Sequence, residues 1–417
     1  MVRWKKFSLG LAVVCLVTCS QAQVQVQAPG GLAAALQATL SQHPAMAGKR
    51  AEVKAKVFQG ETARAQRYPS LTASAESNSS SVNSNPGNVR TRQPLWAFGR
   101  IDASIAYADA DKMAQEAEFK RLQRQLLDQV AVAYPKVLGA HSYLRVAQDS
   151  VKSLVLLSEQ ILRREAGQLA SMSDVRLSQA RMIQAQSLQV RFVGELELAE
   201  NELLALTQTR VVATTLVPVA LTELPAQAML EESAASESAD VLLKRRQVDL
   251  ARAETGRQKT AAMPTVYLQV ENRFNQPVYI NGMIAGVVLE GALDGMGLAA
   301  VGRSKAAEAQ LEAAEKDLES TLNEVARNVR SLWASRQLQM GLMKSQAQSV
   351  AEVEALLASY RRQYEAGTKS WLDILNMQRE LTDQHMQAAQ AENSWLTFTL
   401  KIAALTGRLD NLAQAEK

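Results

Sequence analysis

The sequence is poor in the residues that build compact, many-layered domains. Aromatic residues make up 5% of the 417 residues, and the chain has 20 glycines and 10 prolines. This composition favours long helices. The formal net charge of +4 is small beside 46 basic and 42 acidic side chains, and Lys and Arg do not cluster among aromatic residues. Nucleic-acid binding therefore has little support.

Cysteine is almost absent. Cys15 and Cys19 lie within residues 1–22, where MVRWKK precedes an apolar stretch and then SQA. This order is typical of a signal peptide, so we expect export and a mature chain without thiols or disulfides. Lipidation of Cys19 is an alternative, although Thr18 is unusual before a modified cysteine. An exported chain without disulfides fits a Gram-negative periplasm or outer membrane.

Long apolar runs are missing after residue 22. No segment approaches the roughly 18 to 20 apolar residues that a transmembrane helix needs. If the mature chain enters a membrane, it must do so as a closed β-barrel, because lipid leaves no other way to pair the backbone groups.

A catalytic constellation is also missing. His43, His141 and His385 are scattered over separate regions, and GALDGMG at 291–297 lacks the Lys-Ser or Lys-Thr of a phosphate loop. We therefore expect no enzyme activity, no metal site and no cofactor.

The sequence does contain one long unit twice. From 101 to 165, apolar residues recur at alternating steps of three and four, which predicts a coiled-coil helix on the order of 100 Å long. Pro135 lies inside it and predicts a bend or local overwinding. A second such helix is expected at 302–366.

Both long helices are followed by a turn and a returning helix. Each ends in Glu-Ala-Gly, at Gly167 and Gly367, where glycine can adopt the left-handed conformation that closes a helix. Amphipathic segments then follow at about 172–208 and 370–406. The sequence therefore predicts two helical hairpins.

Both long helices are also preceded by a shorter helix and a strand hairpin. The shorter helices are expected at about 31–66 and 237–262. In TVYLQVENRF, from Thr265 to Phe274, apolar residues alternate with Tyr267, Gln269 and Glu271, which predicts a strand. The hairpins span about 69–98 and 264–296, and the first is more polar.

The repeat defines the domain organisation. After the signal peptide at 1–22 we expect a first repeat at 23–210, a connector with little helix in an equatorial region at 211–236, a second repeat at 237–408 and a C-terminal tail at 409–417. Four strands per chain cannot close a membrane barrel, since the smallest need about eight. Several chains must therefore share one barrel.

The duplicated order, together with EAGQLASMSDV and YEAGTKSWLDILN at the two turns, resembles the TolC-like outer-membrane channel family over nearly all of the mature chain. The resemblance implies a mainly α homotrimer whose hairpins form an α-barrel across the periplasm. Four strands per chain would contribute to a 12-stranded β-barrel in the outer membrane. It also implies a periplasmic adaptor protein and an inner-membrane transporter as partners, in type I protein secretion or efflux of small molecules.

The resemblance further implies a gate at the helical turns. The positions that match the family's acidic constriction are Asp373 and Asn376, so one carboxylate per chain remains and a weaker cation preference is expected. The positions that match its tip latch are Asp174, Tyr364 and Lys369, with Asp174 accepting hydrogen bonds from the other two.

Plainer interpretations remain open. Asp174 and Asp373 can serve only as helix N-terminal carboxylates, and Tyr364 can serve only in packing. For the whole chain, the alternative is a periplasmic coiled-coil adaptor without a pore. It accounts for the heptads and the export signal but not for two strand hairpins, and its best support is the polar hairpin at about 69–98.

Overall fold

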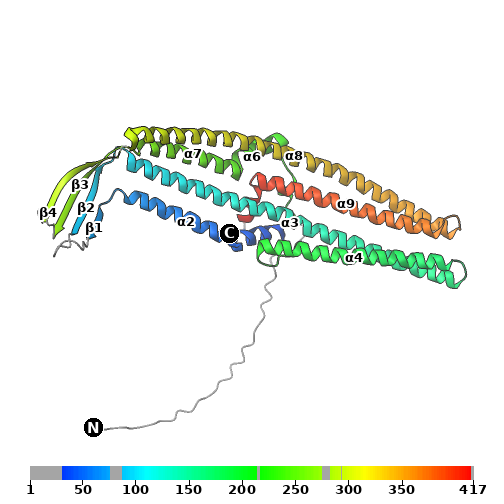
Figure 1. The fold of residues 1–417 in the computed structure, drawn as a ribbon. Helices are drawn as coiled ribbons and strands as arrows, with labels where there is room; N and C mark the ends of the chain where they lie inside the picture. Colours follow the sequence, from blue (N-terminus) through cyan, green and yellow to red (C-terminus); the bar gives the residue numbers. More distant parts are fainter. Residues whose placement is uncertain (1–30, 76–86, 214–216, 275–281, 293, 415–417) are drawn as a thin grey trace, which may run out of the picture.

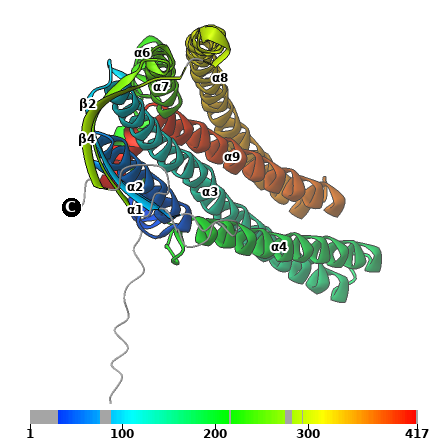
Figure 2. The ribbon, with the colours of Figure 1, turned by 60° about the vertical axis from the view of Figure 1, so that its left-hand side comes forward.

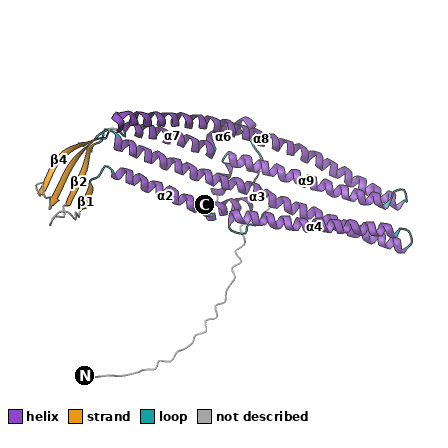
Figure 3. Cartoon of the chain, in the orientation of Figure 1, coloured by secondary structure: helices purple, strands orange, loops and turns teal. Residues whose placement is uncertain are grey.

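The computed structural model describes residues 31–75, 87–213, 217–274, 282–292 and 294–414. Long helices run side by side, with one sheet at one end and two helical turns at the other (Figures 1 and 3). The elements, in chain order, are α1 (Gly31–Gln42), α2 (Pro44–Ala65), β1 (Ser70–Ala75), β2 (Gly87–Trp96), α3 (Arg100–Ala166), α4 (Met172–Thr207), α5 (Val219–Thr222), α6 (Gln227–Glu237), α7 (Ala239–Thr260), β3 (Thr265–Phe274), β4 (Gly282–Glu290), the 3-10 turn η1 (Asp294–Gly297), α8 (Leu298–Glu365), α9 (Trp371–Leu405) and α10 (Arg408–Gln414).

The structure confirms the two long helices that the sequence periodicity predicted. Helix α3 has 67 residues and α8 has 68, so each is about 100 Å long. Helix α3 continues through Pro135 without ending. In the part of the chain that the structure describes, no helix is long and apolar enough to cross a membrane.

The longer helices, α2, α3, α4, α7, α8 and α9, form a single layer rather than a closed bundle. Near the sheet, contacts follow the order α2, α3, α7, α8, and toward the turns they follow the order α4, α3, α9, α8. The sheet has the matching order β1-β2-β3-β4, is antiparallel throughout and bends strongly (Figure 2). The layer therefore has two free edges, one along β1, α2 and α4 and the other along β4 and α8.

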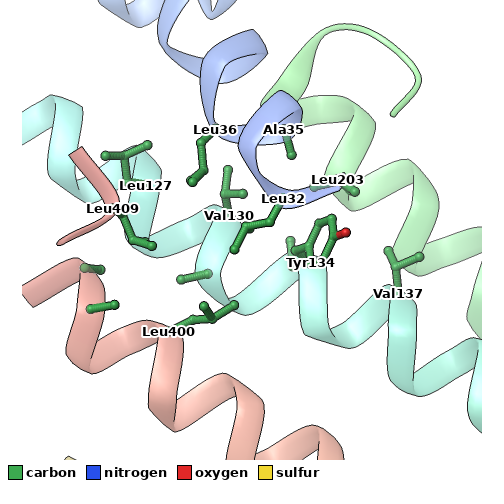
Figure 4. Close-up of a cluster of buried hydrophobic side chains, with 14 of the residues drawn as sticks. Leu32, Ala35, Leu36, Leu127, Val130, Tyr134, Val137, Leu203, Leu400 and Leu409 are labelled. Carbon is green, nitrogen blue, oxygen red and sulfur yellow. The ribbon is translucent and has the colours of Figure 1, made fainter. Parts of the chain in front are cut away.

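The largest hydrophobic core lies halfway along the molecule. There α1 and α10 pack against α3, α4 and α9, and the side chains of Leu36, Val130, Tyr134 and Leu400 are each fully buried (Figure 4). This core fixes the start and the end of the described chain to the middle of the long helices.

Three segments differ from the sequence prediction. Residues 227–236 of the expected connector belong to α6, because Leu230 and Ala234 bury their side chains against α8 and neighbouring helices. Residues 409–414 of the expected tail belong to α10, and Leu409 is fully buried. The first short helix is split at Pro44, where His43 Nδ1 accepts a hydrogen bond from the Ala45 amide at 3.2 Å.

Candidate gate at the helical tips

The two tip turns have the same backbone geometry although their sequences are spaced differently. The left-handed residue is Gly367 in the second turn, with φ of 76°, and Gln168 in the first, with φ of 58°. Gly167 has φ of −86°, so the prediction that it adopts the left-handed conformation was wrong. Helix α3 includes both residues of its Glu-Ala pair and ends at Ala166, whereas α8 ends at Glu365, the first residue of its pair.

The hydrogen bonds confirm this equivalence. The Leu169 amide donates to the Arg164 carbonyl at 2.8 Å, and the Thr368 amide donates to the Gln363 carbonyl at 2.9 Å. Both bonds close a Schellman-type turn. Because Gln168 and not Gly167 is the left-handed residue, both turns have the same six-residue step from that position to their aspartate.

Both aspartates cap the helix that returns from the turn. Asp174 pairs reciprocally with Ser171, and Asp373 pairs with Ser370, whose hydroxyl donates to Asp373 Oδ2 at 2.8 Å. These are capping boxes, which satisfy backbone amides at a helix start. The hydrogen bonds from Ser370 lower the pKa of the Asp373 carboxyl below its usual range. Both residues are therefore helix N-terminal carboxylates in the single chain, and their predicted roles in the constriction and the latch stay predictions.

The predicted constriction residues lie one helical turn apart at the start of α9. Asp373 is half-buried and Asn376 is exposed. A pore lining at these positions needs further copies of the chain, so this role stays a prediction.

The residues predicted to form a latch are separated in the single chain. In the described residues, the hydrogen bonds of Asp174 go to Ser171. The Lys369 ammonium lies 4.3 Å from the ring centroid of Tyr360, within its own hairpin. The predicted contacts of Asp174 with Lys369 and Tyr364 are thus not formed within one protomer.

A different contact joins the two hairpins at this point. Tyr364 is 9% exposed, its ring centroid lies 5.4 Å from that of Trp371, and the Arg164 guanidinium carbon lies 4.5 Å from its centroid. Arg164 is at the end of α3, so this cation–π contact links the first hairpin to the second. Our sequence reasoning missed Arg164, because nothing local distinguishes it from the neighbouring Arg163.

Behind this contact, the hairpins share a hydrophobic cluster. It contains buried side chains from α3, α4, α8 and α9: Leu154, Leu157, Ile161, Val175, Ala185, Leu357, Tyr364, Trp371, Ile374 and Leu375. Further along, the Thr382 hydroxyl of α9 donates to the Ser150 hydroxyl of α3 at 3.1 Å. The two hairpins are therefore packed together through apolar side chains. They are also joined by two individual contacts, Arg164 with Tyr364 and Thr382 with Ser150.

The chain is thus a single layer of long helices with open edges, with a sheet at one end and two helical turns at the other. The model of the outer membrane efflux protein family matches residues 35–208 and 230–408, so the chain belongs to this family. This confirms the resemblance and places the chain among outer-membrane channels and not among enzymes.

Individual relatives agree with this assignment. The alkaline protease secretion protein AprF of Pseudomonas aeruginosa is 23% identical over 345 residues, which cover 76% of this chain and 69% of AprF. The structure of CusC superposes with a TM-score of 0.78 at 16% identity, covering 90% of this chain and 91% of CusC. VceC of Vibrio cholerae superposes with a TM-score of 0.76 at 17% identity, covering 90% and 96%.

Proposed function

We propose that three copies of this chain form the exit duct of a tripartite export system, with a 12-stranded barrel in the outer membrane and a helical tunnel across the periplasm. Residues 1–22 direct the chain to export. A periplasmic adaptor and an inner-membrane transporter engage the helical tips and open them. The observation that supports this proposal most strongly is that the sheet and the helical layer are both open along the same two edges.

The edges are suited to closing a ring. Strands β1 and β4 end the sheet, with no neighbour on their outer sides among the described residues. At the same two edges, α4 exposes Val190 and Leu198, and α8 exposes Leu338 and Leu342. One copy can therefore place its β1 and α4 edge against the β4 and α8 edge of the next, a head-to-tail contact that closes into a ring.

The sheet has one face suited to lipid. The residue pairs Leu268 with Val287 and Val266 with Leu289 set apolar side chains of β3 and β4 on the same face. All charged side chains of the four described strands lie on the opposite face, as the register shows. A membrane barrel needs this arrangement, with apolar side chains outward and polar ones inward.

The same register accounts for the polar first hairpin. Thr72 of β1 pairs with Arg90 of β2, which pairs with Glu271 of β3, so these polar residues share the inward face. In the described strands of this hairpin, the polarity that was the best support for a pore-free adaptor thus lies mainly on the inward face, as a channel requires. The channel accounts for both hairpins, whereas the adaptor accounts for neither.

We propose protein secretion as the transport function, because the relative AprF is named for secretion of a protease. Efflux of small molecules is the alternative. Cells lacking this chain should lose an extracellular protein while their susceptibility to small toxic compounds stays unchanged. The reverse result would support efflux.

The channel itself is tested by conductance of the detergent-extracted mature protein in planar bilayers. We expect a trimer by mass and small, stable single-channel steps, with larger steps when tip contacts are removed. A protein that needs no detergent and never conducts would leave the coiled-coil adaptor as the better account.

A further inference from the structure

A connected network of charged and polar side chains crosses the inward face of the sheet. The described strands contain five charged residues, and the register places all of them on this face: Arg90, Arg92, Glu271, Arg273 and Glu290. We call these five residues the lumenal column. Three are basic and two are acidic, so the column has a net charge of +1 per chain.

Glu271 is the centre of the column. Its carboxylate accepts hydrogen bonds from Arg90 Nη2 and Arg273 Nε, both at 3.1 Å, and from Asn88 Nδ2 at 3.0 Å. Its side chain is 3% exposed, whereas those of Arg90 and Arg273 are each 30% exposed. The two guanidinium groups therefore cover the carboxylate, and the charge presented to the lumen is positive.

The network continues toward the helices. Arg92 Nε donates to Gln269 Oε1 at 2.9 Å, and Arg92 Nη1 donates to Glu290 Oε2 at 2.8 Å. Below it, Arg100 Nη2 at the start of α3 donates to Thr265 Oγ1 at 2.7 Å. Arg100 thus adds a further positive charge at the helical end of the column.

The column is flanked by uncharged side chains. On one side, β1 places Ser70, Thr72 and Ser74 on the inward face. On the other, β4 places Gly286 there, opposite Gln269, between Ile284 and Val288. A Cβ added at Gly286 would meet no atom within 4 Å. Each chain therefore contributes one charged column, separated from the next by a strip of uncharged side chains.

We propose that the strand end of this channel is an anion-attracting filter, formed by Arg90 and Arg273 and ordered by Glu271. The proposal rests on the channel function proposed above. Three copies place six guanidinium groups around one lumen, where a fixed ring of charge selects ions by sign. This sign is opposite to that of the carboxylate at Asp373 at the tip, so the two ends of the duct favour opposite ions.

The test is the chloride-to-potassium permeability ratio in a salt gradient. The double variant R90Q/R273Q changes the column from +1 to −1 per chain, and R90K/R273K is the matched control that keeps the charge. Six changed charges about 10 Å from a central ion, screened over a Debye length of about 10 Å, predict that the ratio falls about fivefold or more in R90Q/R273Q. It should stay near the parent value in R90K/R273K.

A second variant keeps the network intact. Gly286→Asp adds a carboxylate in open space beside the column and breaks no hydrogen bond, so it should lower the ratio in the same direction. A ratio that is the same in the parent, R90Q/R273Q and Gly286→Asp channels overturns the filter while the channel stands. A parent that never forms pores overturns the channel and the filter together.

Discussion

Removing the guanidinium group of Arg164 should make the tip easier to open. In the structure this group lies 4.5 Å from the ring centroid of Tyr364, at a half-buried position between the hairpins. A cation–π contact of this kind contributes about 0.5 to 1 kcal/mol. If all three copies must separate, the sum is about 1.5 to 3 kcal/mol, which shifts the opening equilibrium roughly 10- to 150-fold.

The assay is the open probability of single channels formed by Arg164→Gln, compared with the parent. Arg163→Gln is the matched control, because Arg163 is 72% exposed and its nearest acidic partner is Glu159 at 3.9 Å. Lys369→Ala should also have little effect, since the Lys369 ammonium contacts its own hairpin. Equal open probabilities in Arg164→Gln and Arg163→Gln would refute the contact as a latch, and a large effect of Lys369→Ala alone would favour the family-like latch instead.

Three further predictions concern the tips and the seam between hairpins. Gln168→Gly should stabilise the oligomer by about 1 kcal/mol per chain and Gly367→Ala should destabilise it similarly, because only glycine adopts positive φ without strain; thermal dissociation in detergent measures both. The depressed pKa of Asp373 keeps its carboxylate charged down into the ordinary aspartate range, so cation preference at the tip should persist at pH 5, fall only below about pH 4 and be reduced in Asp373→Asn. Gly139→Ala should destabilise by about 1 to 3 kcal/mol, since the new Cβ would lie 2.7 Å from Asn393 Cγ, and Asn393→Ala should relieve part of the loss.

Each of these three predictions would be contradicted by a specific result. If Gln168→Gly and Gly367→Ala both stabilised the oligomer, or if neither did, the turn conformations would differ from those described. Cation preference that disappears well above pH 5 would show that Ser370 does not stabilise the Asp373 carboxylate. A stable Gly139→Ala variant would show that α3 and α9 approach less closely than the structure indicates.

The sequence alone was sufficient to predict the two long helices, the returning helices, the two strand hairpins and their order along the chain. The alternation of three and four residues predicted both long helices within a few residues of their ends, and the period of two predicted the strand that begins at Thr265. These patterns reflect local hydrogen bonding and the burial of one face of each element. Both depend on residues that are close together in the chain. The same patterns led to the family, because the order of elements is duplicated.

The tertiary structure decided which residues meet across that duplication. It brought Arg164 against Tyr364 and paired Arg90 with Glu271. It also gave the left-handed conformation to Gln168 instead of Gly167, and it folded part of the expected connector as α6. No local pattern determines these outcomes, because a coiled-coil seam repeats every few residues and several registers bury similar apolar area. The register is selected only when all the helices and strands pack together, and the functional contacts follow from that choice.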